Sequence, residues 1–237
     1  PEDDNIYMIS AGGSFWKGDI NGLNWEVVNQ DLRFDGRFLI LAELPDNSTR
    51  FISSINGHPY YSEGGLEWSS SNTFPDNTSP KNKNVISVNK GKDIFFLSKL
   101  RTGENVKLYH SDDYGNSFHA IKTFLTSDLD NMAITHCDNK VFAIEQKSIS
   151  TSRIYQWDAD LDQIIVINEN SNFSFGATGE ANLEAVNIED NIILYAYNAS
   201  KELKSSINLG QQWNLVSVLP RMPWEGGFYI SRTYPNI

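Results

Sequence analysis

Ser111-Asp112-Asp113-Tyr114-Gly115-Asn116-Ser117-Phe118 decides the fold, because its pattern of Ser, x, Asp, x, Gly, x, x, aromatic recurs along the chain. A carboxylate or amide at the third position can accept hydrogen bonds from backbone N–H groups of its own turn, and glycine at the fifth adopts a positive φ at little cost. The aromatic residue begins the next strand and anchors it. The pattern therefore predicts a tight hairpin turn. Its other copies are a good one at 206–213, weaker ones at 61–68 and 18–25, and an eroded one at 157–164.

The last positions of these turns are spaced at nearly equal intervals. They are 43 residues apart from Trp25 to Trp68, then 50 to Phe118, 46 to Ile164 and 49 to Trp213. Another 49 residues lead from Trp213 to the C-terminus and on from the N-terminus to Trp25. One four-stranded blade takes about 40 to 50 residues. The spacing predicts an all-β fold, a five-bladed β-propeller of four-stranded antiparallel blades in a single domain over residues 1–237. A fragment of a six- or seven-bladed ring is the alternative.

Two apolar runs precede each turn and predict the first two strands of each blade. The first runs are 38–41, 85–88, 132–135 and 183–186, and the second runs are 51–53, 94–97, 141–144 and 192–195. The N-terminal unit has only a second run, at 6–9, and the strand that it lacks stands at 228–231. We therefore expect the C-terminal strand to complete the N-terminal blade and close the ring.

The repeated turn resembles the Asp-box, or BNR, repeat of sialidase-like β-propellers. The resemblance covers nearly the whole chain and implies the fold more than an activity, since such boxes occur in hydrolases, sorting receptors and assembly factors alike. It assigns a structural role in the turns to Gly22, Trp25, Glu63, Gly65, Trp68, Ser111, Asp113, Gly115, Phe118, Ser206, Asn208, Gly210 and Trp213.

Charge and composition narrow the possible partners. The net charge of −11 argues against nucleic acid and an anionic membrane, which both require clustered Lys or Arg, and no apolar run is long enough for a membrane-spanning helix. We expect no cofactor and no metal, because the alternating acids at 158–162 lack the glycine of a calcium loop. The single cysteine, Cys137, is expected to be a small buried thiol.

Four sequons, at 47–49, 77–79, 172–174 and 198–200, are typical of secreted proteins, although a chain rich in Asn, Ser and Thr contains some by chance. We expect a secreted or extracytoplasmic location.

Ligands of propellers usually bind at the central mouth, which the loops entering the first strands and the loops joining the second and third strands form. Several carboxylates meeting there could supply the acid and base of glycoside hydrolysis. The catalytic candidates are Asp35, Asp130, Glu180, Glu184 and Glu225, and the ligand-binding candidates are Trp224, Arg37, His58 and Arg232. Asn131, Asn182, Arg101, Glu104 and Arg153 are expected nearby. Trp224 could stack on a sugar ring, whereas Arg232 could instead form a structural ion pair in the channel.

Three functions remain open. The first is recognition of a glycan or glycosylated ligand at one asymmetric site, which we favour, because the repeats have diverged too far to form five equal sites. The second is a glycoside hydrolase, although the Arg-Ile-Pro segment of sialidases and the Asp-Pro signatures of five-bladed glycosidases are absent. The third is a protein-interaction scaffold.

Overall fold

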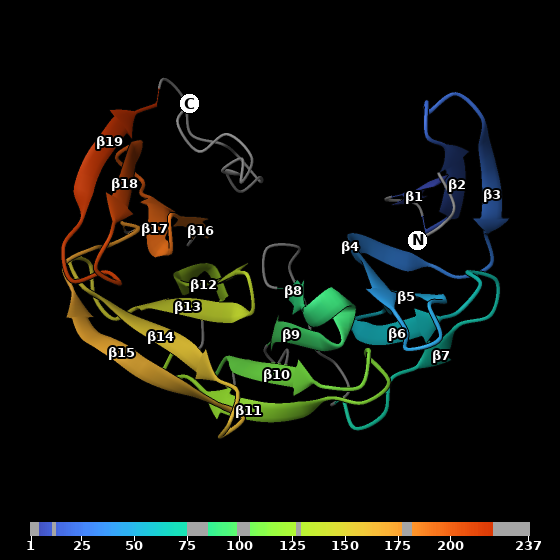
Figure 1. The fold of residues 1–237 in the computed structure, drawn as a ribbon, viewed down its shortest axis with the longest axis horizontal. Coiled ribbons are helices and arrows are strands. Elements are labelled where there is room, and N and C mark those ends of the chain that lie inside the picture. The colour runs from blue at the N-terminus through green and yellow to red at the C-terminus, as the bar shows by residue number, and fades with distance from the viewer. Residues whose placement is uncertain are drawn as a thin grey trace. The chain divides into compact units, whose positions relative to one another are not determined.

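The computed structural model describes residues 5–10, 13–74, 85–98, 105–126, 129–176 and 182–219. Within these residues the chain forms five antiparallel sheets, whose strands follow one another in chain order (Figure 1). The first sheet has three strands: β1 (Asn5–Ile9), β2 (Phe15–Asp19) and β3 (Trp25–Asn29). The second comprises β4 (Phe34–Glu43), β5 (Thr49–Ile55), β6 (His58–Ser62) and β7 (Ser69–Ser70).

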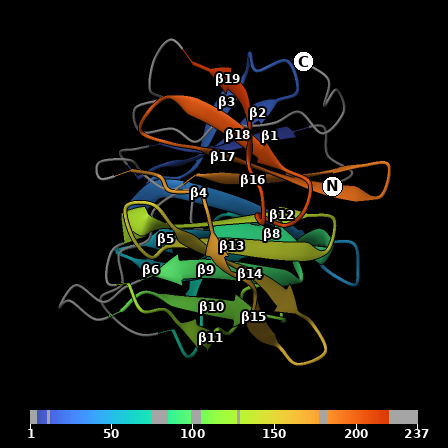
Figure 2. The ribbon, with the colours of Figure 1, turned by 90° about the vertical axis from the view of Figure 1, so that its left-hand side faces the viewer.

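The other three sheets have four strands each. The third consists of β8 (Val85–Val88), β9 (Asp93–Ser98), β10 (Lys107–Ser111) and β11 (His119–Thr123). The fourth consists of β12 (Met132–Cys137), β13 (Lys140–Gln146), β14 (Ser152–Asp158) and β15 (Gln163–Ser171). The fifth consists of β16 (Leu183–Ile188), β17 (Asn191–Tyr197), β18 (Glu202–Ser206) and β19 (Asn214–Val218). Figure 2 shows the strands of these last two sheets side by side in chain order.

The strands predicted from the apolar runs are confirmed in all five sheets. Every repeated turn joins the third strand of a repeat to its fourth, from β2–β3 in the first sheet to β18–β19 in the fifth. The first sheet lacks its innermost strand among the described residues, and the segment 228–231 predicted to supply it lies outside them. Closure by the C-terminal strand therefore stays a prediction.

Helices contribute little to the described part of the chain. Two 3-10 turns, η2 (Asn89–Gly91) and η3 (Leu129–Asn131), are short, and none of the helices in these ranges could span a bilayer.

The chain divides into two compact units. One holds residues 1–104 and 108–120, and the other holds 105–107 and 121–237. The first two sheets lie in the first unit, the last two lie in the second, and the third sheet contributes residues to both. The single domain over residues 1–237 stays a prediction.

Apolar side chains fill the spaces between adjacent sheets within each unit. The strands alternate side chains between their two faces, so each sheet can present apolar residues to both of its neighbours. Cys137, 2% exposed, belongs to one of the resulting clusters, which confirms that it is a buried thiol. Within the described residues, such clusters centre on Phe15, Phe34 and Phe51 (first and second sheets), Ile52, Phe96 and Phe118 (second and third), and Phe142, Ile154 and Leu194 (fourth and fifth).

The glycine at the fifth position of three turns packs against the preceding sheet. Gly65, Gly115 and Gly210 have φ of +77°, +78° and +79°, a region that side chains with a Cβ rarely adopt. A Cβ added to them would meet the side chains of Phe15, Ile52 and Ile154, respectively. Glycine is therefore required at this position both by the turn and by the close approach of two sheets.

A serine on the preceding sheet adds a hydrogen bond at the same junction. Ser71, just after β7, donates from Oγ to the carbonyl oxygen of Gly115, 2.5 Å away, and Ser171, at the end of β15, donates to the carbonyl oxygen of Gly210, 2.7 Å away. Both serines are buried. The same backbone segment is thus packed and hydrogen-bonded to its neighbour.

Two adjacent glycines allow this requirement to be tested. We expect Gly65→Ala to lower the free energy of unfolding by about 3 kcal/mol, because the alanine backbone must keep a positive φ and its methyl group overlaps the ring of Phe15. Gly64→Ala should change it by less than about 0.5 kcal/mol, since the space beside Gly64 is open and its φ is not positive. Denaturant unfolding of both variants measures the difference, and equal losses would contradict the packing argument.

Candidate functional site

The turn at 111–118 is held by side chains of the turn itself. Asp113 accepts hydrogen bonds from the backbone N–H of Ser117 (2.9 Å), the hydroxyl of Ser117 (2.6 Å) and the hydroxyl of Ser111 (2.8 Å). Ser111 Oγ in turn accepts a hydrogen bond from the N–H of Gly115, 2.9 Å away. Burial alone would raise the pKa of Asp113, but the hydrogen bonds from Ser117 and Ser111 outweigh it and hold that pKa below its ordinary value of 3.8.

The turn at 206–213 repeats this geometry with an amide. Asn208 Oδ1 accepts from the N–H of Gln212 (2.9 Å) and the hydroxyl of Ser206 (2.9 Å), and Ser206 Oγ accepts from the N–H of Gly210 (2.8 Å). Asparagine and aspartate are interchangeable here because both offer an acceptor oxygen at the same place. The third-position side chain thus serves the turn in both copies.

The weaker turns are held differently. In the turn at 61–68, Ser62 Oγ accepts from the N–H of Gly65 (2.8 Å), but the half-exposed Glu63 is paired with Arg50 (2.6 Å). In the turn at 18–25, Asp19 stands one position after the turn begins and accepts from the N–H of Leu23 (3.0 Å). Divergence of the pattern has left both hairpins intact, and in the turn at 61–68 the third-position side chain, Glu63, pairs with Arg50 of a neighbouring strand instead of with its own turn.

Most of the residues predicted at the central mouth, or their side chains, lie outside the described part of the chain. Glu180, Trp224, Glu225, Arg232, Arg101 and Glu104 lie outside the described residues, as do the side chains of Asp35 and Arg37, whose backbone belongs to β4. Asp130 lies in η3, directly before β12, and Glu184 lies in β16 opposite Tyr195 of β17. His58 begins β6, with its ring 6.1 Å from that of Phe74. A carboxylate pair at the mouth therefore stays a prediction.

Arg153 was expected in a loop near the mouth, but it lies inside β14 and is bound to neighbouring strands. Its guanidinium donates to Glu145 Oε2 (3.3 Å), to the Tyr155 hydroxyl (3.2 Å) and to both carboxylate oxygens of Glu169. Hydrogen bonds from Arg153, and then from Lys147, lower the pKa of Glu169 to about 2. All of these partners of Arg153 lie in the fourth sheet.

Glu145 is the buried centre of this network. Its Oε1 accepts from the backbone N–H groups of Leu125 and Thr126, both 3.1 Å away, and its Oε2 accepts from the Tyr155 hydroxyl, 2.5 Å away. Burial, together with the hydrogen bond to Glu145, raises the pKa of Tyr155 above its ordinary value of 10.0. Tyr, Glu and Arg are also the residue types of a sialidase centre, but Glu145 and Tyr155 are 2% and 1% exposed, so a substrate cannot reach them. The network fixes the segment 124–126 to the sheet.

Among the described residues, an open pocket lies beside each of the turns at 18–25 and 61–68. The pocket in the first sheet has a volume of about 290 Å³ and is lined by Asn5, Lys17, Gly18, Asp19, Asn24, Trp25 and Glu26. The pocket in the second sheet has a volume of about 500 Å³ and is lined by Tyr61, Ser62, Glu63, Gly64, Leu66, Glu67 and Ser69. When the two turns are aligned on Trp25 and Trp68, the lining positions 18, 19, 24 and 26 correspond to 61, 62, 67 and 69.

Both pockets contain an aromatic ring, supplied from different positions. Trp25 lies over Gly18, where a Cβ would be 2.8 Å from the indole, and its Nε1 donates to the carbonyl oxygen of Gly22 (2.9 Å). The second sheet has Tyr61 in place of this glycine, and the guanidinium of Arg50 lies 4.7 Å from the centre of its ring. Trp68 instead packs edge-on against Phe15 in the core. The repeat pattern gives Trp25 a structural role in the turn and gives Tyr61 no role, so it does not predict either pocket. Gly18 is the one sequence signal for the first pocket, since the absence of a side chain there leaves room for the ring of Trp25.

Comparisons with known proteins place the fold but not the function. No family model matches this chain, and no curated protein sequence is similar to it. Among solved structures, a GH74 xyloglucanase from Xanthomonas campestris aligns with 92% of this chain at 14% identity and a TM-score of 0.58. YCF48 from Cyanidioschyzon merolae aligns with 93% at 13% identity and a TM-score of 0.59, and the Dos1 propeller with 92% at 13% identity and a TM-score of 0.56.

The alignments cover 37% of the xyloglucanase chain, 71% of YCF48 and 55% of the Dos1 propeller. The fold of this chain is that of a β-propeller, and its five sheets agree with the number of blades predicted.

The turn aspartate gives a pH-dependent prediction. We expect Asp113→Ala to lower the free energy of unfolding by about 2 kcal/mol at pH 7, because three donors lose a charged acceptor. The folded-state pKa of Asp113 is lowered, so its contribution is present above the unfolded-state value and is lost as the pH falls through 3.8 toward the folded value. The difference from wild type in urea unfolding should therefore shrink between pH 5 and pH 3. Asp112→Ala, a change at an exposed neighbour, should have little effect at either pH, and a pH-independent loss for Asp113→Ala would contradict the assignment.

The buried carboxylate gives a second prediction. Glu145→Ala should destabilise the protein by about 3–5 kcal/mol, because it leaves the Tyr155 hydroxyl and two backbone N–H groups without their acceptor and removes one of the two carboxylates that bind Arg153. Glu169→Gln, at the half-exposed end of the same network, should cause a much smaller loss that disappears in high salt. Thermal unfolding at low and high ionic strength distinguishes the two. Similar losses in the two variants would show that burial does not set the strength of this network.

Proposed function

We propose that this protein is a carbohydrate-recognising β-propeller, that its repeated turns are Asp-boxes, and that the pockets beside the first two of these turns bind the sugar. The observation that carries the proposal is the recurrence of one combination at equivalent places in successive sheets. Each pocket has an aromatic ring, Trp25 or Tyr61, beside carboxylates that line the same opening.

This combination matches the two surfaces of a sugar. The C–H groups of a pyranose form an apolar face that can pack on an aromatic ring, and its hydroxyl groups donate to carboxylate or amide oxygens. Asp19, Asn24 and Glu26 offer such acceptors in the first pocket, and Glu63 and Glu67 offer them in the second. Trp25 is 37% exposed, so its ring is open to a ligand.

The pockets differ enough to favour different parts of a glycan. Lys17 adds a cation to the first pocket, whereas the acidic groups of the second have Leu66, 66% exposed, beside them. A ligand that carries several sugars or several glycans could engage both pockets, and the effective concentration after the first contact would strengthen weak individual binding. The proposal therefore names a glycan chain or a glycosylated ligand as partner.

A glycan array, followed by calorimetric titration with the best ligand, tests the proposal. We expect Trp25→Ala and Tyr61→Ala each to weaken binding at least about tenfold, which corresponds to about 1.4 kcal/mol, and the double variant to abolish it. Leu23→Ala is the control, since Leu23 is exposed beside the first pocket but does not line it. Circular dichroism of each variant verifies folding.

Three outcomes would overturn the proposal. Binding that survives the double variant would exclude these pockets, and silence on the array would favour a protein partner. Turnover of aryl glycosides that is lost in Glu184→Gln would instead favour a glycoside hydrolase with its centre at the predicted mouth.

A further inference from the structure

The outer strand of the first sheet links the two turn pockets. β3 begins at Trp25 and Glu26, which line the first pocket, and it ends at Asn29. The side-chain amide of Asn29 donates to the carbonyl oxygen of Leu66, 2.7 Å away, and Leu66 lines the second pocket. Figure 1 shows the end of β3 beside the loop between β6 and β7. One strand and one hydrogen bond therefore connect the pockets.

The two ends of this strand present side chains on the face that is directed toward the second sheet. In β2, Phe15 and Lys17 are two residues apart and so lie on the same face. Their partners in β3 are Asn29 and Glu26, respectively, because the pairing is irregular beside Phe15. This face is the one toward the second sheet, since Phe15 packs edge-on against Trp68. Glu26 and Asn29 thus both lie on the side of β3 that leads to the second pocket.

The length of this path sets the size of a ligand that reaches both pockets. Residues of a strand rise about 3.3 Å each, so the path from Glu26 along β3 and across the amide of Asn29 to Leu66 is about 10 to 15 Å. A pyranose with its glycosidic oxygen extends about 5 Å, given single-bond lengths of about 1.5 Å. Glu26 is exposed and Leu66 is 66% exposed, so solvent reaches both ends. A linear glycan of about three or four units would therefore span the two pockets.

Asn29 fixes the separation of the pockets. Its Oδ1 accepts from the backbone N–H groups of Asp31 (3.0 Å) and Leu32 (3.2 Å), which holds the chain after β3, while its Nδ2 holds the turn of the second pocket. A single side chain thus ties the first sheet to the turn at 61–68. Because the spacing is set before a ligand binds, a chain of matching length need not order the protein in order to occupy both pockets.

We infer that the two pockets are the ends of one site for a linear oligosaccharide of at least three units, which lies along β3, with Asn29 as the residue that positions the second pocket relative to the first. This inference rests on the proposed function and deepens it. The ligand is a single sugar chain, whereas two separate glycans on one partner would require no fixed spacing between the pockets.

Calorimetric titration with linear cello-, xylo-, manno- and chito-oligosaccharides of one to six units tests the inference. In the series that binds, we expect the affinity to rise at least about tenfold between the disaccharide and the tetrasaccharide, because the second contact is then intramolecular. One long chain should bind per protein. Equal affinity at every length would overturn the inference and leave the proposed function intact, as would two ligands per protein at every length. Binding to none of the series would overturn both.

Asn29→Asp distinguishes the positioning role from a general structural one. Aspartate keeps the acceptor oxygen for Asp31 and Leu32 but has no N–H to donate to Leu66. We expect the variant to bind the disaccharide as wild type does and to lose most of the gain for the tetrasaccharide. Asn47→Asp is the matched control, since it adds the same charge at an exposed turn of the same unit that lines neither pocket.

The control variant should bind both ligands as wild type does. A full gain with chain length in Asn29→Asp would contradict the role of Asn29, and so would equal weakening of the disaccharide and the tetrasaccharide.

Discussion

The approach of each repeated turn to the sheet before it is the constraint on which the rest of this structure depends. At Gly65 and Gly210 the backbone lies so close to a neighbouring apolar side chain that there is no room for a Cβ, and at Gly115 a Cβ would make a tight contact with Ile52. The turn forms within its own sheet, but its glycine also closes the junction with another sheet. A turn of eight residues therefore also fixes how its sheet packs against the preceding sheet. For this reason the recurrence of the turn can predict a fold of five sheets.

The hydrogen bonds of the turns explain why the motif can erode without loss of the hairpin. Asp113 and Asn208 both accept from the serine two residues before them and from the backbone N–H four residues after them, whereas in the second sheet Ser62 accepts from the N–H of Gly65 and Trp68 donates to the carbonyl oxygen of that glycine. Where the third-position side chain is not needed for the turn, as with Glu63, it is available for other contacts. The pockets proposed for glycans lie beside the two diverged turns at 18–25 and 61–68, and not beside the turns that keep the full pattern.

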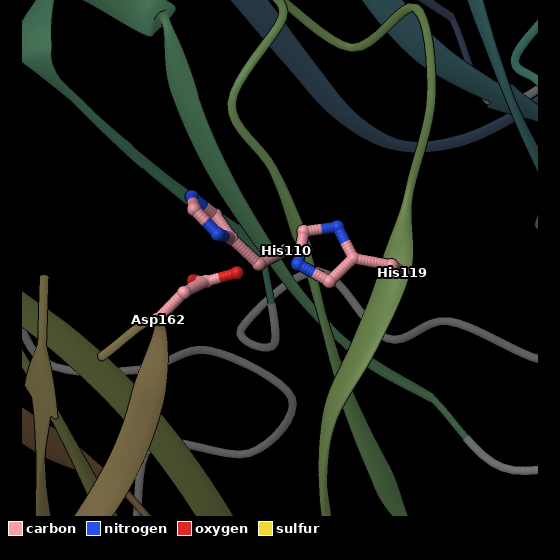
Figure 3. A group of neighbouring side chains, drawn as sticks. All are labelled: His110, His119 and Asp162. Carbon is pink, nitrogen blue, oxygen red and sulfur yellow. The ribbon is translucent and has the colours of Figure 1, made fainter. Parts of the chain in front are cut away.

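The buried carboxylates Glu145 and Asp93 are each surrounded by several hydrogen-bond donors. Glu145 is surrounded by donors from a loop, a tyrosine and an arginine, and Asp93 by a histidine and an amide. The first group has no access to solvent and holds a segment in place, which separates it from a catalytic centre built from the same residue types. The second group holds the imidazole of His110, which Figure 3 shows next to that of His119, in a fixed orientation beside Phe95.

The sequence by itself determined the class of fold, the number of sheets, the strand order and the positions of the turns, because these follow from turn chemistry and from apolar runs that are local in the chain. It also identified Cys137 as a buried thiol. Only the tertiary structure decided what the side chains do: that Arg153 is tied to Glu145 and Glu169, that the ring of Trp25 lies on Gly18, and that His110 is held by Asp93. Such contacts join residues from different strands, and their distances depend on strand register and on the rotation of each ring, which no single stretch of sequence encodes.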